Sequence, residues 1–338
     1  MREPKKKSIK TGSNPRTKRP GLTVSIIGVG RLGTTLGRAL AHHGYQVEAV
    51  TALHRASAQR AARLIGGKTI ALAGPNLNSL PESDLILITT PDDAIGAVAE
   101  QLSRRAKAAV KSPKARPPCR VVLHASGALS SEILGPLRKA GFALGSMHPL
   151  VSISDRAADI GAFTDAFFCL EGDGGALRMA RSVVRNLGGQ SFSLDPSNKP
   201  LYHAAAVMAS GHVTALVDIA VEMLVKCGLS RLRARLVLMP LLESNLMNLL
   251  TQTPARALTG PFARGDAETA RRHLDAIAAH HLDDALAAYA ILGKRSLELA
   301  SQNGMDQKAL VEIRKEIDQA LKTAEVRGRK SEVSNQSQ

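Results

Sequence analysis

The sequence predicts an α/β domain with a doubly wound parallel sheet, followed by an all-α C-terminal domain. Strand and helix patterns alternate up to about residue 195, and every later pattern is helical. A glycine-rich turn near the start separates the first predicted strand from the first predicted helix. With 338 residues, the chain is long enough for two domains that each have a core. We place the domains at 21–195 and 196–325, between disordered tails at 1–20 and 326–338.

The glycine turn follows the β-branched run Thr23–Ile27, which is typical of a strand covered on both faces. Gly28, Gly30 and Gly33 fit the spacing GxGxxG, and apolar residues at helical spacing come next. In this pattern the first glycine allows a tight turn, the second admits a pyrophosphate and the third lets helix and strand pack closely. The stretch therefore predicts a dinucleotide site, with Arg31 and Leu32 at the start of the helix.

The remaining elements of the predicted sheet domain follow in order. Strands are expected at 46–51, 84–90, 120–124, 143–147, 166–170 and 190–194, and helices at 57–65, 92–102 and 176–187. The basic segment 104–118 is expected to be a surface loop. In the second domain we expect helices at 201–227, 267–279, 284–300 and 306–323, with Pro240 kinking or breaking the helix that contains it.

Composition excludes several classes of protein. Residues 1–20 and 104–120 each carry a charge of +7, so they supply 14 of the net +16, and the remaining 301 residues are nearly balanced. Aromatic residues make up 3% and Trp is absent, so stacking platforms for nucleic acid are not expected. The three cysteines, Cys119, Cys169 and Cys227, suggest neither a disulfide framework nor a metal site. No uninterrupted apolar run approaches 18 residues, and we expect a cytoplasmic protein without a membrane segment.

The end of the second strand bears on the choice of nicotinamide cofactor. NAD-binding versions of the fold place a carboxylate there for the ribose hydroxyls, whereas a 2′-phosphate calls for cations and hydroxyls. No acid occupies this position, and Arg55 and Ser57 follow it. We therefore expect NADP rather than NAD, although a solvated Arg55 and a helix-capping Ser57 would produce the same pattern.

Six motifs together resemble a known family. They are GVGRLGTTL, TTPDDAI (89–95), LHASGALSSEIL (123–134), SMHPLVSI (146–153), YHAAAVMAS (202–210) and LTGPFARGD (258–266). The set is similar to Rossmann-like proteins that carry a C-terminal helical domain of unknown function. These are relatives of pyrroline-5-carboxylate reductase, prephenate dehydrogenase and deazaflavin-dependent NADP reductases. The resemblance implies NADP binding, a homodimer built by the helical domain, and an active site at the domain junction. Gly211 and His212 stand where many relatives have Asn-Tyr, so a substrate-orienting Asn is not carried over.

Two residues at predicted strand ends are candidates for proton transfer. Histidine exchanges protons near neutral pH, and ligands of doubly wound folds bind at the carboxyl edge of the sheet. The pair Ser126 and His148 resembles the serine and histidine that handle the substrate hydroxyl in prephenate dehydrogenases. We expect His148 to act as acid or base with Ser126 as its hydrogen-bonding partner. A turn histidine that satisfies backbone groups is the structural alternative.

Further candidates come from other motifs. Lys199 and His203 lie four residues apart at a helix start, and resemblance to hydroxyacid dehydrogenases makes Lys199 a rival acid, although a lysine beside a proline is usually solvated. We expect His203, rather than His212, to face the cleft. By analogy with pyrroline-5-carboxylate reductases, Arg264 is the candidate clamp for a substrate carboxylate, unless it is simply exposed in a helix connection.

The remaining site predictions concern the nicotinamide side and metals. Thr90, Pro91 and Asp92 end a strand and begin a helix, so they should line the nicotinamide side, although Asp92 would equally serve as an N-cap. His124, at the end of the next strand, is a further candidate for binding the cofactor. The adjacent histidine pairs at 42–43 and 280–281 do not share a helix face, so no metal site is predicted.

These observations predict an NADP-dependent oxidoreductase that transfers a hydride to or from a small, carboxylate-bearing substrate. A non-catalytic NADP-binding module, with a helical domain that serves dimerisation or a partner, is the alternative. A nucleic-acid binder would require the two basic segments to converge on one face.

Overall fold

The computed structural model describes residues 21–74, 77–109, 120–155 and 160–335. The chain forms two compact units that meet between Val207 and Met208, within a helix that starts in the first unit. The basic tail 1–20 and most of the basic segment after residue 104 lie outside the described residues.

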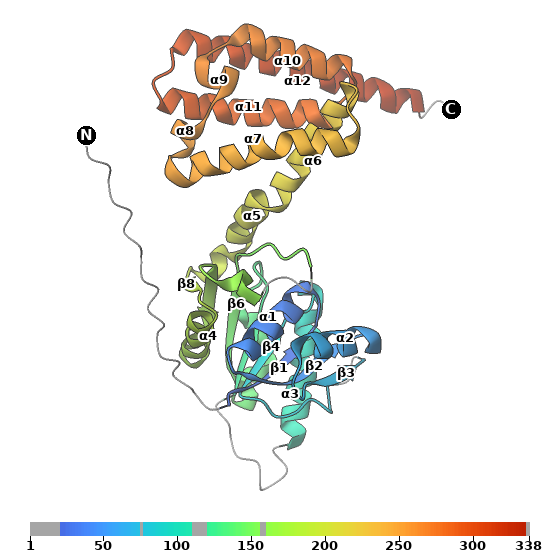
Figure 1. Ribbon diagram of the computed structural model, residues 1–338, viewed down its shortest axis with the longest axis vertical. Helices are drawn as coiled ribbons and strands as arrows, with labels where there is room; N and C mark the ends of the chain where they lie inside the picture. Colours follow the sequence, from blue (N-terminus) through green and yellow to red (C-terminus); the bar gives the residue numbers. More distant parts are fainter. Residues whose placement is uncertain (1–20, 75–76, 110–119, 156–159, 336–338) are drawn as a thin grey trace, which may run out of the picture. The chain divides into compact units, whose positions relative to one another are not determined.

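The first unit is built on an eight-stranded sheet with the strand order β3-β2-β1-β4-β5-β6-β7-β8 (Figure 1). The strands are β1 Thr23–Ile27, β2 Gln46–Ala52, β3 Ile70–Ala73, β4 Leu85–Ile88, β5 Val121–His124, β6 Ala143–Pro149, β7 Phe167–Gly172 and β8 Gln190–Phe192. Strands β1 to β6 are parallel, which confirms the predicted doubly wound class. Strand β7 runs antiparallel to β6, so the sheet is not parallel throughout.

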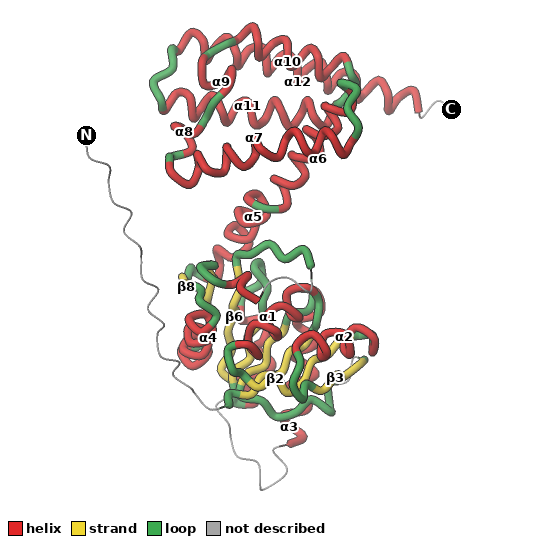
Figure 2. The backbone as a smooth tube through the Cα atoms, in the orientation of Figure 1, coloured by secondary structure: helices red, strands yellow, loops and turns green. Residues whose placement is uncertain are grey.

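Helices and 3-10 segments cover the sheet between its strands (Figure 2). They are α1 Arg31–His42, α2 Arg55–Ile65, α3 Asp92–Ala109, η1 Ser131–Ala140, η2 Ile160–Phe163, α4 Gly174–Asn186 and η3 Pro196–Asn198. Residues of α1, α2 and α4 pack into one apolar cluster and residues of α3 and η1 into another, one on each face of the sheet. Alternate residues of the same strand enter different clusters, as Ile26 and Ile27 do.

The second unit is helical, as predicted. Its helices are α6 Gly211–Lys226, α7 Arg231–Thr251, α8 Pro254–Ala257, α9 Gly260–Arg264, α10 Ala267–Ala279, α11 Asp283–Gln302 and α12 Gln307–Asn335. Its core is formed mainly by apolar residues of α9 to α12. Of the kink or break expected at Pro240, the break is wrong, because α7 runs through the proline.

Three further boundaries differ from those predicted. The helix expected at 201–227 is two helices, α5 Lys199–Ala209 and α6, which are separated at Ser210. The segment expected to be a loop from residue 104 begins as the last turns of α3. Helix α12 continues into the range expected to be a disordered tail.

One stretch of the described residues, Pro196–Lys226, contains an 18-residue window with a mean hydropathy of 1.6. By length and composition alone this stretch could cross a membrane. Polar residues such as His203 and His212 interrupt the stretch, so it contains no uninterrupted apolar run of that length.

Candidate functional site

The glycine turn lies at the point where the strand order reverses. Strand β1 pairs with β2 on one side and β4 on the other, so the turn after β1 lies beside the residues that follow β4. Gly28 has a φ of +97°, and a Cβ there would be 2.7 Å from the backbone nitrogen of Thr90. A Cβ on Gly33 would be 2.4 Å from both the Gly28 carbonyl oxygen and the Thr89 hydroxyl. Both positions therefore require glycine for the turn itself.

Gly30 differs from the other two glycines of the turn. A Cβ at this position would meet no atom within 4 Å, so the local structure does not require glycine there. Gly30 is the N-cap of α1, whose first turn has no side-chain cap and no acidic residue. Such a helix end leaves N–H donors and the positive end of the helix dipole free for an anion. Arg31 and Leu32 open the helix, and the Arg31 guanidinium also reaches the carbonyl oxygen of Ser154 at 3.4 Å.

The end of β2, like the end of β1, is followed by a helix whose first turn has no side-chain cap and no acidic residue. Helix α2 begins at Arg55, and its N-cap is His54, without a side-chain hydrogen bond and without an acid in the first turn. Ser57 is therefore inside the first turn rather than at the cap. Arg55 is exposed, and the residues from His54 to Ser57 include no carboxylate.

Hydrogen bonds of Ser126 fix the conformation of the loop after β5. Its hydroxyl donates to the Asp92 carboxylate at 2.8 Å and accepts from the backbone N–H groups of Ala128 at 3.1 Å and Leu129 at 3.0 Å. A hydroxyl has one donor and two lone pairs, so protein groups use all of them. The backbone N–H of Ser126 also donates to Nδ1 of His124 at 3.2 Å. This arrangement fixes the loop that carries Gly127.

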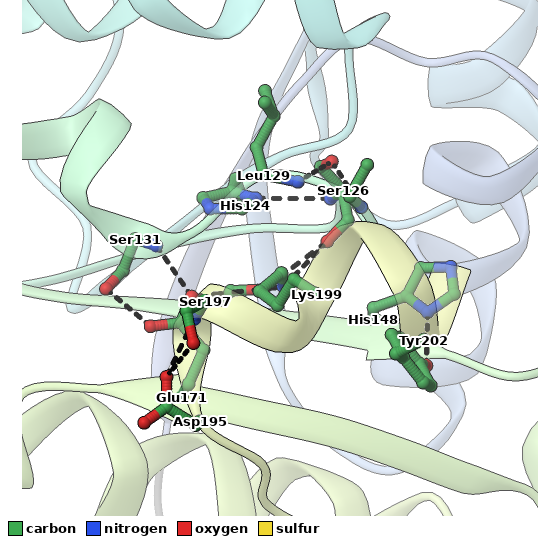
Figure 3. A network of polar contacts seen from close by, with 12 residues as sticks. His124, Ser126, Leu129, Ser131, His148, Glu171, Asp195, Ser197, Lys199 and Tyr202 are labelled. Atoms are coloured by element: carbon green, nitrogen blue, oxygen red, sulfur yellow. Dashed lines mark hydrogen bonds and ion pairs between the residues drawn. The ribbon is translucent and has the colours of Figure 1, made fainter. Parts of the chain in front are cut away.

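Lys199 is fully buried, contrary to the expectation of a solvated helix-start lysine. Its ammonium donates to the carbonyl oxygen of Ser126 at 3.1 Å (Figure 3). It also donates to the hydroxyl of Ser146 at 2.5 Å. It also lies 3.9 Å from Oε1 of Glu171, whose carboxylate accepts from the backbone N–H and the hydroxyl of Ser131. Burial lowers the pKa of Lys199, and the carboxylate of Glu171 opposes that shift. The lysine thereby joins the start of α5 to residues at the ends of β5, β6 and β7.

The imidazole rings of His148 and His203 pack against each other and against Gly127. Their rings lie edge to face with centroids 5.4 Å apart. A Cβ on Gly127 would be 2.3 Å from Nδ1 of His203 and 2.8 Å from Nε2 of His148, so only glycine leaves room for both imidazoles. On its other side, Nδ1 of His148 is 2.6 Å from the hydroxyl of Tyr202. Burial and the neighbouring His203 and Lys199 lower the pKa of His148 to about 4.

Three buried side-chain polar atoms have no hydrogen-bond partner among the described residues: Thr90 Oγ1, His124 Nε2 and His203 Nδ1. Thr90 and His124 are at the carboxyl ends of β4 and β5, and His203 packs on the Gly127 that follows β5. Buried polar atoms are normally paired, so unpaired ones commonly mark a place where a ligand or water binds. Their common location identifies the carboxyl edge of the sheet as the candidate site.

The predicted site residues fall into two groups. Most lie in the first unit, at this edge: the glycine turn, Thr90, Pro91, His124, Ser126, His148, Lys199 and His203. Arg264 belongs to the second unit, where it is exposed at the end of α9, and His212 is exposed on α6. Among the described residues, no group of three or more His, Cys, Asp or Glu side chains could hold a metal ion. The sequence did not single out Tyr202, Gly127 or Glu171 as site residues. Tyr202 lies in the motif YHAAAVMAS, but nothing in the motif indicates the hydrogen bond between its hydroxyl and His148.

Comparison with known proteins gives two family matches. A Rossmann-like domain model matches residues 1–149, and a domain of unknown function, DUF2520, matches residues 166–296. No curated protein matches the chain.

Several solved structures share the fold. A Bacteroides fragilis protein described as a "putative NADP oxidoreductase" is 20% identical, with a TM-score of 0.65, 82% of this chain covered and 98% of that one. Protein TM1727 of Thermotoga maritima is 24% identical, with a TM-score of 0.60 and coverage of 83% and 100%. A 1-pyrroline-5-carboxylate reductase of Streptococcus pyogenes is 14% identical, with a TM-score of 0.52 and coverage of 83% and 99%. At these identities the likeness is one of fold. The chain thus joins a Rossmann-like domain to a DUF2520 domain, the combination that its motifs predicted.

Proposed function

We propose that this protein is an NADP-dependent oxidoreductase that transfers a hydride to or from a small substrate. The observation that carries the proposal is the glycine turn at the point of strand reversal, with open space at Gly30 above an uncapped helix end. That geometry fits a pyrophosphate, because it offers free backbone donors and no side chain that would exclude the ligand. The Bacteroides fragilis neighbour, described as a "putative NADP oxidoreductase", supports the same proposal.

The cofactor preference rests on the end of β2. The guanidinium of Arg55 and the first turn of α2, which contains Ser57, would hold a 2′-phosphate, and no carboxylate is present there for the ribose hydroxyls of NAD. Thr90, Pro91 and His124 would line the nicotinamide. When bound, this ring supplies or accepts the hydride.

The proposed roles of the other residues follow from their contacts. His148 is the group that exchanges a hydrogen bond or proton with the substrate, and His203 lies beside it with a free ring nitrogen. Ser126 and Lys199 have their polar atoms engaged by protein groups, so we assign them to positioning: Ser126 shapes the Gly127 loop and Lys199 anchors α5. This differs from the sequence-based roles of hydrogen-bonding partner and rival acid.

The substrate is proposed to carry a carboxylate. Arg264 remains the proposed clamp for it by analogy with pyrroline-5-carboxylate reductases.

We also propose that the protein is a cytoplasmic homodimer formed through the second unit. Helices α6 and α7 expose many large apolar side chains, here called the α6–α7 apolar surface: Val213, Leu216, Val225, Leu232, Leu236, Val237, Leu241, Leu246, Met247, Leu249 and Leu250. Exposed apolar surface of this extent is typical of an interface. A second copy fits it better than a membrane, because the apolar stretch begins with the buried Lys199 network and is interrupted at Ser210.

In the alternative, a non-catalytic module, the protein would bind NADP but would have no side chain placed to exchange a proton with a substrate. The free nitrogen of His203, beside His148, favours an enzyme.

Titration calorimetry with NADPH and NADH tests the cofactor proposal. We expect NADPH to bind more tightly, and Arg55→Ala to weaken NADPH about tenfold to a hundredfold with little effect on NADH, because a charge-assisted bond contributes about 1.5–3 kcal/mol. Arg60→Ala, an exposed arginine on the same helix, is the control and should change neither affinity. Binding of neither nucleotide would overturn the proposal, and equal losses for both would remove the NADP preference.

A further inference from the structure

Tyr202 is a half-buried residue whose hydroxyl the proposed function leaves unused. Its hydroxyl lies 2.6 Å from Nδ1 of His148, and no other hydrogen bond of that hydroxyl is recorded among the described residues. Tyr202 also packs edge to face on His148, with centroids 5.6 Å apart, and on Phe192 at 5.8 Å. Three residues earlier on α5, the buried ammonium of Lys199 fixes the start of the helix. The ring contacts with His148 and Phe192 and the hydrogen bond to Nδ1 therefore fix the position of the hydroxyl.

The direction of this hydrogen bond decides what His148 presents to the site. A neutral imidazole has one N–H, and its position depends on the bond that the other nitrogen makes. If the tyrosine donates to Nδ1, the proton of His148 is on Nε2, the nitrogen that faces Gly127 and His203. If Nδ1 donates to the tyrosine, Nε2 is a bare acceptor.

We propose that Tyr202 is a positioning residue whose hydroxyl donates to Nδ1 of His148 and holds it in the Nε2–H tautomer. A phenol is a better donor than acceptor, an imidazole nitrogen is a strong acceptor, and burial raises the pKa of Tyr202, so the hydroxyl keeps its proton. His148 then offers a neutral N–H donor to the substrate. Such a donor suits a carbonyl or imine group whose heteroatom accepts a hydrogen bond.

The proposal rests on the proposed function for the presence of a substrate, but the tautomer itself can be measured without one. In the full chain labelled with ¹⁵N-histidine, two-bond ¹H–¹⁵N correlation spectra distinguish protonated from bare ring nitrogens. The His148 signals are assigned from their loss in His148→Asn. We expect wild-type His148 to show a protonated Nε2 and a bare Nδ1 at pH 7. A bare Nε2 would overturn the proposal.

Two variants extend the test. In Tyr202→Phe we expect the single tautomer to become a mixture, because Nδ1 loses its donor. Tyr289→Phe is a matched control: the Tyr289 hydroxyl lies 2.7 Å from Nδ1 of His273 in the second unit, so its loss should alter His273 and leave His148 unchanged. An unchanged His148 in Tyr202→Phe would contradict the proposal.

The wild-type spectrum decides the matter even if Tyr202→Phe does not fold, which a change in the signals of His124, a buried histidine of the same unit, would reveal. Failure of NADPH to bind would overturn the proposed function but would leave the tautomer result intact.

Discussion

His124 and His148 are held neutral by their surroundings. Burial is the largest cause for each, and the nearby ammonium of Lys199 adds to it, so that each has a pKa of about 4 instead of 6.5. A protonated His124 would be a charge with 1% of its surface exposed. Neutral imidazoles can donate or accept hydrogen bonds to a substrate without bringing a charge into the site.

These pKa values predict how stability depends on pH. The folded pKa of about 4 lies below the unfolded value of 6.5, so the unfolded state takes up protons first as the pH falls. The contribution of His124 and His148 to the free energy of unfolding should therefore decrease as the pH falls from about 6.5 to about 4, and level off below. Urea unfolding at a series of pH values measures this slope. His124→Gln should reduce it by up to about 1.4 kcal/mol per pH unit, the value for one proton.

The control for this prediction is His280→Gln, because His280 is exposed in the second unit. It should leave the slope as in the wild type. A His124→Gln variant with the wild-type slope would show that His124 is not protonated on unfolding in this range.

Among the elements, α5 is tied to the sheet by a buried charge network. The Lys199 ammonium contacts Ser126, Ser146 and Glu171, which follow or belong to β5, β6 and β7. Removing one member of such a network leaves an uncompensated buried group, which typically costs about 3–5 kcal/mol. The position of Tyr202 and His203 therefore depends on this anchor.

A double-mutant cycle tests the anchor. Lys199→Met should destabilise strongly, because Glu171 would stay buried without its cation. Lys199→Met combined with Glu171→Gln should be less destabilised than the sum of the single variants, with an interaction energy of about 1–3 kcal/mol in chemical unfolding. Additive effects would mean that the two side chains, 3.9 Å apart, do not stabilise one another.

The sequence predicted the buried parallel strands well and the edges of the sheet less well. β1, β4 and β5 are short stretches that are mostly apolar and β-branched, a pattern that clearly predicts a buried strand. β3 is short and only partly buried, so its residues carry no clear pattern. The direction of β7 depends on its connection to β6, which contains a 3-10 segment rather than a crossover helix, and periodicity does not report direction.

In the site, too, features set by local sequence were predictable and features set by residues distant in sequence were not. The glycine turn was predictable because the GxGxxG spacing lies within one short stretch between a strand pattern and a helix pattern. The burial of Lys199 was not, since its partners come from three strands that are distant in sequence. The break at Ser210 between α5 and α6 was hidden by an apolar composition that continues across it.

For the whole molecule, the apolar surface of the second unit predicts self-association. Leu241, 66% exposed on α7, belongs to the α6–α7 apolar surface. Leu241→Glu should convert a dimer to a monomer, because a carboxylate at an apolar interface is costly to desolvate. Light scattering coupled to size exclusion measures the mass. Val311→Glu is a matched control on α12, where Val311 is 67% exposed, and should leave the mass unchanged. A wild-type monomer would contradict the dimer.

The central claim is that the glycine turn binds a nicotinamide dinucleotide, and the most direct test is thermal unfolding with and without NADPH. Gly30→Ala is informative because its Cβ would meet no protein atom within 4 Å, so the variant should fold as stably as the wild type. Gly135→Ala, which also meets nothing within 4 Å, is the control away from the turn.

We predict that NADPH raises the melting temperature of the wild type and of Gly135→Ala, since a ligand at a hundred times its Kd stabilises by about 2.7 kcal/mol. Gly30→Ala should keep its melting temperature without ligand and lose most of the rise, because the methyl group would occupy the space of the pyrophosphate. An equal rise in Gly30→Ala, or no rise in the wild type, would contradict the account.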